Sequence, residues 1–173
     1  MDIRDAILGR RSIRKYAERD ISSDIIDDLL RTAMAAPSAG NEQPWHFIVI
    51  SEREILDRIP AFHPYATPIQ RAPVGICICG DLTMEIYEGC WVQDCAAATQ
   101  NLLLAAHAAG LGAVWLGLYP REERIAGMQT LLHLPDHVIP LAVVALGYPA
   151  EEKRPANRFD RSRIHHNTWT RKE

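Results

Sequence analysis

A long apolar segment without charged residues places the strongest limit on the fold of this chain. From Leu102 to Tyr119 the sequence LLLAAHAAGLGAVWLGLY contains no Asp, Glu, Lys or Arg. A membrane helix needs ~20 consecutive apolar residues, and Gly110 and Gly112 interrupt this segment. It therefore predicts a buried helix, a tight turn and a buried strand rather than a membrane span, and other elements must cover all three.

The composition is typical of a soluble globular domain. The chain has 173 residues, 47% of them hydrophobic and 24% charged, with a net charge of −3. This length can enclose a real core, and the negative net charge gives no global field that attracts nucleic acid. The segment 1–11 is charged from its second residue and does not resemble a secretion signal. We expect one domain over 1–173, a cytoplasmic location, and neither a membrane nor a nucleic acid as partner.

Helical and strand patterns alternate along the chain without an internal repeat. We expect helices at 2–9, from a cap at Ser22 or Ser23 to just before Pro37, at 52–59, 91–109 and 121–129. We expect strands at 45–50, 74–80, 113–118 and 138–147, with a proline-rich loop at 60–73. The helix at 91–109 is apolar around most of its circumference, which indicates a place in a core or an interface.

The four cysteines do not predict disulfides or a metal site. Cys77 and Cys79 are two apart in an apolar strand, so both side chains point to one face. Without a secretion signal, reduced thiols are expected. A zinc site that combines cysteines with the histidines at 165–166 is a weak alternative, because no Cys-x2-Cys pair is present. We expect no metal.

Two basic segments are candidates for binding an anion. The first runs from Arg10 to Lys15 as RRSIRK, and the second from Lys153 to Arg158 as KRPANR. Arginine holds phosphate through paired charged hydrogen bonds, and a serine hydroxyl adds a further donor. The two segments could close on one phosphate, or each could be a solvated basic patch.

Two uncharged segments are candidates for binding a flat ring. In PSAGNEQPW, at 37–45, small residues allow close approach of the backbone, and Ser, Asn and Gln offer uncharged donors and acceptors. The alternative is a turn with side chains capping the backbone. The strand at 113–118 nears its end at Gly117, where a backbone N–H could face a ring with no side chain in the way. Simple packing of a glycine is the alternative, and the segment is no GxGxxG fingerprint.

Taken together and in this order, these segments resemble the nitroreductase family in its short form. The resemblance covers almost the whole chain, and is carried by RRSIRKY at 10–16, APSAGNEQPWHF at 36–47, AVWLG at 113–117 and RPANRF at 154–159. It implies an α+β fold of three α/β/α layers, in which helices flank a mixed sheet. It also implies an intertwined homodimer that binds FMN at two interface sites, with the tail 151–173 wrapping the partner subunit.

The resemblance assigns roles to individual residues. Arg10, Ser12 and Arg158 would hold the FMN phosphate with Arg11 nearby, and Arg14 would lie at the pyrimidine edge of the flavin, where a cation stabilises the negative charge of reduction. The residues that would reach or adjoin the flavin of the partner subunit are Pro37, Ser38, Ala39, Asn41 and Gln43. The residues that would line the ring are Trp115, Leu116 and Gly117, with the Gly117 N–H near flavin N5.

The implied activity is that of an FMN-dependent oxidoreductase. Hydride would pass from NADH or NADPH through flavin N5 to a nitroaromatic, a quinone or a similar small acceptor, by a ping-pong mechanism. No catalytic side chain is expected, because the flavin carries the chemistry. His63 and Tyr65 are candidates for the substrate side, or ordinary loop residues. The alternatives are reductive dehalogenation or flavin fragmentation on the same fold, or an FMN-binding protein without turnover.

Overall fold

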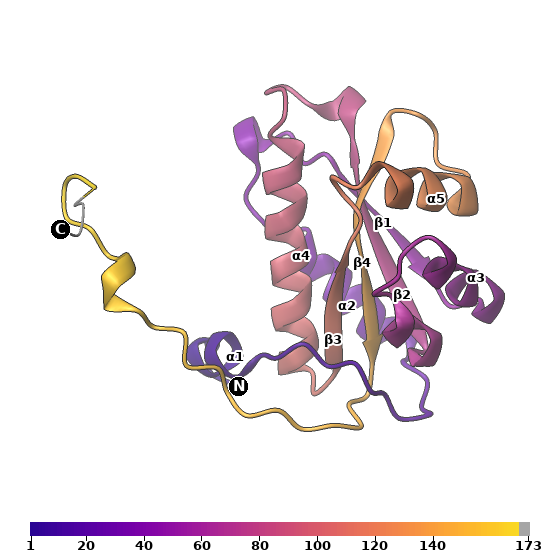
Figure 1. The fold of residues 1–173 in the computed structure, drawn as a ribbon, viewed down its shortest axis with the longest axis horizontal. Coiled ribbons are helices and arrows are strands. Elements are labelled where there is room, and N and C mark those ends of the chain that lie inside the picture. The colour runs from indigo at the N-terminus through magenta and orange to yellow at the C-terminus, as the bar shows by residue number, and fades with distance from the viewer. Residues whose placement is uncertain (170–173) are drawn as a thin grey trace.

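A four-stranded sheet forms the centre of the computed structural model, which describes residues 1–169. The strand order is β1-β2-β4-β3 (Figure 1). The strands are β1 (Trp45–Ile50), β2 (Val74–Asp81), β3 (Gly112–Gly117) and β4 (Val138–Gly147). All four lie within two residues of the predicted bounds, since each is a short apolar run bounded by Gly, Pro or charged residues.

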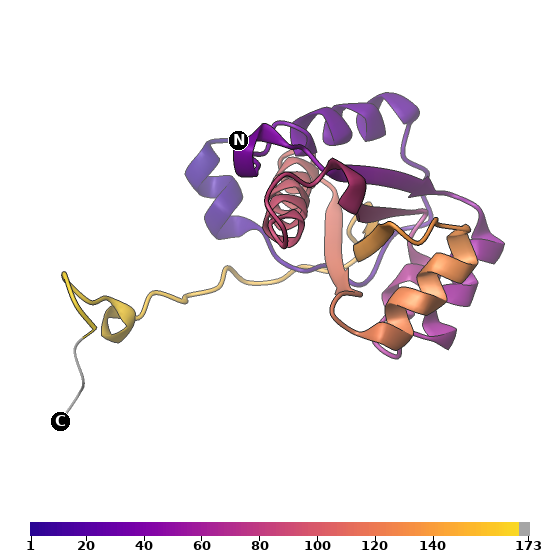
Figure 2. The ribbon, with the colours of Figure 1, turned by 90° about the horizontal axis from the view of Figure 1, so that it is seen from above.

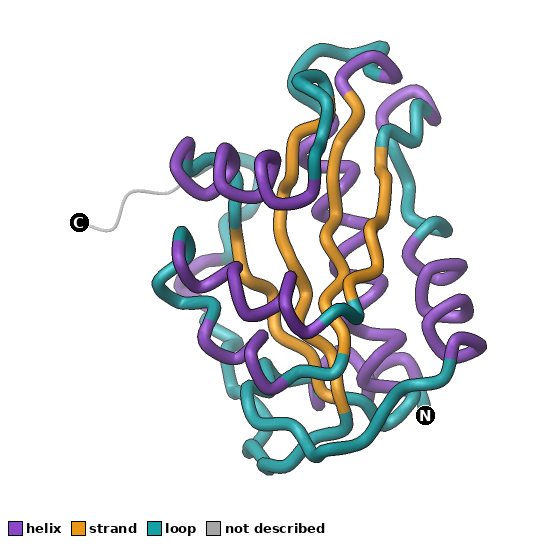
Figure 3. The backbone as a smooth tube through the Cα atoms, turned by 90° about the vertical axis from the view of Figure 1, so that its right-hand side faces the viewer, coloured by secondary structure: helices purple, strands orange, loops and turns teal. Residues whose placement is uncertain are grey.

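Helices cover both faces of this sheet. They are α2 (Ser23–Ala33), α3 (Arg53–Arg58), α4 (Trp91–Ala108) and α5 (Glu122–Leu132), and α1 (Ile3–Gly9) packs against α4. One apolar core joins α2 and α4 to one face of the sheet, and a second joins α3 and α5 to the other (Figure 3). The prediction of an α+β fold in three layers is therefore confirmed.

Side chains of β2 alternate between the two cores. Ile76 and Ile78 pack on the side of α2 and α4, whereas Cys77 and Cys79 pack on the opposite side. The two sulfur atoms lie 3.7 Å apart, which confirms that they share a face, and both are free thiols. A strand buried on both faces explains why this part of the sequence is apolar without a break.

The sheet differs from the predicted mixed sheet. All three ladders between named strands are antiparallel, and the parallel pairing described within residues 1–169 is a single bridge between Ser12 and Ala113. The reason lies in the strand order. The strands β2 and β3, joined through α4, run in the same direction, but β4 lies between them and pairs with both.

The uncharged segment folds as predicted. Its first part ends α4, Gly110 turns the chain at φ 75°, and β3 follows. Leu102 and Ala106 are fully buried. The expected loop at 60–73 is more ordered than predicted and contains the 3₁₀ turn Thr67–Arg71. Within residues 1–169, no helix has the length and apolar character needed to cross a membrane.

The tail leaves the domain after β4. It passes α1 in extended form, makes one turn at Arg161–Arg163, and projects away from the sheet (Figures 1 and 2). Phe159 and Trp169 are 75% and 81% exposed. Large aromatic side chains on an extended segment have little of their own domain to pack against. Wrapping of a partner subunit by this tail stays a prediction.

Candidate functional site

The N-terminal basic segment lies against the start of the edge strand β3. Ser12 bridges to Ala113, and the Ile13 N–H donates to the Ala113 carbonyl over 3.0 Å. In the part of the chain that the structure describes, no strand continues this pairing toward Gly117. The outer edge of β3 beyond Ala113 is therefore open to a ligand.

The register of β3 directs the Gly117 backbone toward that open edge. The Leu118 N–H donates inward to Leu141 of β4 over 3.0 Å, while the Ala113 carbonyl points outward to Ile13. Because backbone groups alternate in an antiparallel ladder, Gly117 presents its N–H and C=O outward. This is the orientation that the predicted role of its N–H requires.

The segment that follows β4 is tied to the N-terminal basic segment. The Lys153 Nζ donates to the Ser12 carbonyl over 3.0 Å and forms an ion pair of 3.2 Å with Glu151. The same carboxylate accepts the Arg14 N–H over 2.6 Å. The two basic segments, about 140 residues apart in the sequence, are thus held side by side.

The arginines of these segments converge. Burial lowers the pKa of Arg10, and the charges of Arg158 and then Arg11 lower it further. The Arg11 Nη1 donates to the carbonyl of Arg154. No ion pair within residues 1–169 includes Arg10, Arg11 or Arg158. Like charges that gather without an ion pair to a carboxylate fit a multivalent anion such as a phosphate monoester.

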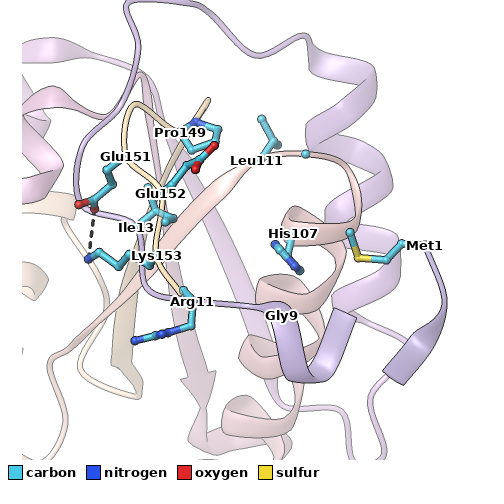
Figure 4. Close-up of a pocket in the computed structure, with 11 residues that line it drawn as sticks. Met1, Gly9, Arg11, Ile13, His107, Leu111, Pro149, Glu151, Glu152 and Lys153 are labelled. Atoms are coloured by element: carbon cyan, nitrogen blue, oxygen red, sulfur yellow. Dashed lines mark ion pairs between the residues drawn. The ribbon is translucent and has the colours of Figure 1, made fainter. Parts of the chain in front are cut away.

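A cavity of about 370 Å³ lies beside this arginine cluster (Figure 4). It opens between the ends of α1 and α4 and the segment at 149–153, where Glu151 faces Lys153 and Glu152 also lines the wall. Carboxylates in its wall oppose an anion. We therefore do not place the phosphate inside this cavity.

A larger cleft of about 610 Å³ follows the other end of β3. The residues that line it are Arg14, His63, Pro64, Tyr65, Thr67, Pro68, Val114, Trp115, Leu116, Gly117 and Arg124. It brings together four of the residues predicted to contact the flavin and both candidates for the substrate side, from three separate segments. No carboxylate lines it.

Arg124 is a charged lining residue that the sequence did not predict. Its Nη1 donates to the Gly117 carbonyl over 2.8 Å, and its Cζ lies 5.6 Å from the ring centroid of Tyr65. The one available signal was a cation in the first turn of the helix that follows a glycine-ended strand. That signal is weak, because such a cation is commonly a solvated side chain.

The two candidates for the substrate side differ in exposure. His63 is 2% exposed and Tyr65 is 73% exposed. The Tyr65 N–H donates to the His63 Nδ1 over 3.3 Å, and the rings meet edge to face at 6.5 Å. Burial lowers the pKa of His63, and the charge of Arg124 lowers it further. A neutral His63 therefore supports the loop, and Tyr65 presents its ring to the cleft.

The segment at 37–43 does not line the cleft of its own chain. Gly40, Asn41 and Gln43 all adopt left-handed backbone, with φ of 52°, 59° and 48°. The Gln43 N–H donates to the Ser38 hydroxyl over 3.1 Å, and the Gln43 side chain donates to Asn41 over 2.8 Å. Non-glycine residues in this conformation cost about 1–3 kcal/mol each and cluster at ligand sites.

A buried pair of carboxyl groups supports this segment. Asp94, in the first turn of α4, accepts the Ala39 N–H over 3.0 Å. Glu42 accepts the N–H groups of Ile86 and Tyr87 over 2.7 and 3.0 Å. Burial raises the pKa of Asp94. The hydrogen bond from the Ala39 N–H lowers it, but the adjacent Glu42 carboxyl raises it again, so the net shift is upward. Burial also tends to raise the pKa of Glu42, but its two backbone donors outweigh that effect and lower it.

One oxygen of each carboxyl in this pair, Glu42 Oε1 and Asp94 Oδ2, is buried and has no partner among residues 1–169 other than the facing carboxyl. A neutral Asp94 that donates its proton to an ionised Glu42 satisfies both oxygens. The pair therefore anchors the strained segment at 37–43 to α4.

The fold is α+β, and its edge strand β3 is open. An arginine cluster lies at one end of that edge, and a cleft without carboxylates lies at the other. This arrangement is typical of a protein that binds an elongated anionic cofactor. A family model described as the nitroreductase family matches residues 7–63 and 61–148. The chain belongs to this family and is an oxidoreductase.

Individual relatives match over nearly the whole chain. A Methanothermobacter thermautotrophicus protein named as an NADH dehydrogenase/NAD(P)H nitroreductase is 52% identical over 98% of this chain and 88% of its own. A crystal structure of a Parabacteroides distasonis protein of the same name gives a TM-score of 0.93 at 42% identity, covering 96% of this chain and 98% of that one. A Desulfovibrio desulfuricans nitroreductase in complex with FMN gives a TM-score of 0.84 at 32% identity, covering 98% and 99%.

Proposed function

We propose that this protein is an FMN-dependent oxidoreductase that transfers electrons from NADH or NADPH to a small acceptor such as a nitroaromatic or a quinone. The observation that carries the proposal is the open edge of β3, which joins the arginine cluster at its start to the cleft at its end. The FMN in the related Desulfovibrio structure and the NAD(P)H in the names of the other relatives support it.

The edge of β3 matches an elongated cofactor with a phosphate at one end. Ser12 pairs with Ala113, and Gly117 lies four residues further along, which is roughly 13 Å in a strand. Arg10, Ser12 and Arg158, with Arg11, would hold the phosphate at the first position. The flavin ring would then lie along Trp115, Leu116 and Gly117.

The positive charge of the cleft favours a flavin ring that gains negative charge when it is reduced. Arg14 and Arg124 are cations and no carboxylate lines the cleft. A preorganised cation at the pyrimidine edge stabilises a reduced flavin without reorganisation, which is the role proposed for Arg14. When bound, FMN supplies the hydride relay between NAD(P)H and the acceptor, and the protein binds, orients and shields the reactants.

We further propose that 1–173 is one domain and that it works as a homodimer. Ile3, Ile7 and Leu8 of α1 are exposed, as are Phe159 and Trp169 of the tail. Exposed apolar side chains at the two ends of one chain are typical of a subunit interface. The segment at 37–43, which lies outside its own cleft, would then reach the flavin of the partner subunit.

Initial-velocity kinetics test the proposed activity. With the FMN-loaded protein, NAD(P)H and a nitroaromatic or quinone are varied together, and double-reciprocal plots are expected to be parallel, as a ping-pong sequence requires. Intersecting lines would contradict that sequence. Consumption of the flavin itself would indicate flavin fragmentation, and halide release from a halogenated phenol without nitroaromatic turnover would indicate reductive dehalogenation.

A further inference from the structure

The guanidinium of Arg124 has more hydrogen-bond donors in the cleft than its contacts with the protein use. Within residues 1–169 its described contacts are the hydrogen bond to the Gly117 carbonyl and the ring of Tyr65. No ion pair of that part of the chain includes it. A guanidinium has five N–H donors, and the Gly117 carbonyl engages one nitrogen. Donors remain for a ligand in the cleft.

The surroundings of Arg124 favour an anion as that ligand. No Asp or Glu lines the cleft, and burial lowers the pKa of His63, which also lines it. Arg124 also lies in the first turn of α5, where the helix dipole favours negative charge. A half-buried guanidinium in such surroundings forms strong paired hydrogen bonds to a carboxylate.

We propose that Arg124 is a specificity-determining residue that binds a carboxylate on the electron acceptor, while the exposed ring of Tyr65 packs against the body of the acceptor. This inference rests on the proposed function, because it assumes that the reacting ring lies along β3. It narrows the acceptor to a small aromatic or quinonoid acid. The carboxylate itself is not changed in the reaction.

The position of Arg124 favours the acceptor over NAD(P)H as the source of the anion. Its guanidinium donates a hydrogen bond to the Gly117 carbonyl, at the end of β3 where the reacting ring is proposed to lie. The phosphates of NAD(P)H are separated from the nicotinamide by a ribose, and the group on the nicotinamide ring is a neutral amide. An anion so close to the reacting atoms therefore belongs to the acceptor.

The test compares isosteric acceptors that differ in charge. With the FMN-loaded protein, kcat/KM is measured for 4-nitrobenzoate and 4-nitrobenzamide, and the binding of unreactive benzoate and benzamide is measured by calorimetry. A charge-assisted hydrogen bond predicts a preference for the acid of roughly 10- to 100-fold in both measurements. In Arg124→Gln that preference is expected to disappear, and Arg124→Lys is expected to retain part of it.

Arg121→Gln is the matched control. Arg121 carries the same charge three residues earlier, is exposed and does not line the cleft, so this variant is expected to keep the full preference for the acid. Equal use of acid and amide by the wild-type protein, or an unchanged preference in Arg124→Gln, would overturn the inference.

Stopped-flow reduction of the bound flavin separates the remaining outcomes. A slower reduction by NADH or NADPH in Arg124→Gln, without loss of the preference for the acid, would assign Arg124 to the dinucleotide and overturn the inference. A wild-type protein that binds no FMN, or whose FMN is not reduced by NAD(P)H, would instead refute the proposed function. The two failures are therefore distinguishable.

Discussion

Arg10 is the single residue on which the proposed phosphate site depends most, because it is partly buried and the charges of both Arg158 and Arg11 act on it. Replacing it with alanine removes a charge-assisted hydrogen bond worth about 1.5–3 kcal/mol. Arg10→Ala is therefore expected to weaken FMN binding by roughly 10- to 100-fold. Loss of a ligand that binds the native state also lowers the melting temperature in the presence of FMN.

The flavin-to-protein ratio after purification and the melting temperature with added FMN measure this effect. Arg31→Ala is a suitable control, since Arg31 lies on the outer surface of α2 and forms an ion pair with the exposed Asp28. Flavin content that is the same in Arg10→Ala, Arg31→Ala and the wild type would count against the phosphate site.

At Gly127, contact with Phe62 is expected to reverse the usual preference of helices for alanine over glycine. Alanine usually stabilises a helix by about 1 kcal/mol relative to glycine. In α5, however, a Cβ at this position would lie 2.4 Å from Cγ of Phe62. Gly127→Ala is therefore expected to lower the free energy of unfolding by about 1–3 kcal/mol, as overpacking does.

Denaturant titration of Gly127→Ala checks this expectation. Thr130→Ala, at an exposed position of the same helix, is the control and is expected to change stability by less than about 0.5 kcal/mol. A stabilised Gly127→Ala variant would mean that Phe62 does not pack against α5 as described.

At the scale of elements, the sequence predicts what depends on local pattern. The uninterrupted apolar run of β2 and the uncharged stretch through α4 and β3 fix their own type and bounds, because period and composition are local properties. The relative direction of neighbouring strands is not a local property. It depends on the insertion of β4, the last strand in the chain, between β2 and β3. The sequence of no single segment predicts that insertion.

The same limit applies to the candidate site. RRSIRKY and AVWLG are recognisable as motifs, and the structure places Arg14 and Gly117 in one cleft. Arg124 belongs to no motif, and its importance arises only because α5 turns back against the end of β3 and brings the guanidinium to the Gly117 carbonyl. Contacts of this kind follow from packing between elements, which a single sequence does not specify.

The carboxyl pair that joins α4 to the segment at 37–43 predicts a pH effect on stability. The pKa of Asp94 is raised above its ordinary value of 3.8 in the folded state. The folded state thus binds this proton more tightly than the unfolded state, so stability falls as pH rises from that value through the folded pKa. Asparagine cannot lose a proton, can donate to Glu42 and can still accept from Ala39.

Asp94→Asn is therefore expected to have a higher melting temperature than the wild type at neutral pH. The difference should shrink as pH falls and vanish near pH 3.8, the ordinary pKa of Asp. Thermal unfolding from pH 3 to 8 measures it, with the exposed Asp136→Asn as control. An Asp94→Asn variant that is less stable than the wild type at every pH would show that Asp94 is ionised in the fold.

At the scale of the whole molecule, the tail is proposed to connect two subunits. Its exposed aromatic residues, Phe159 and Trp169, find little to pack against in their own domain, and Arg158 belongs to the proposed phosphate site. Deleting residues 155–173 is therefore expected to weaken the dimer and to release FMN. Light scattering across a dilution series and the flavin-to-protein ratio measure the two effects. A truncated chain that remains a flavin-loaded dimer at all concentrations would refute the wrapping tail.

The central claim is that this chain holds FMN along the edge of β3 and passes electrons through it. The most direct test is the visible absorbance spectrum of the purified protein, supplied with FMN and freed of excess, before and after addition of NADH or NADPH under argon. We expect the bands of oxidised flavin to accompany the protein and to bleach when the nicotinamide is added. Absence of those bands would contradict the binding site, and bands that persist with both nicotinamides would contradict the proposed activity.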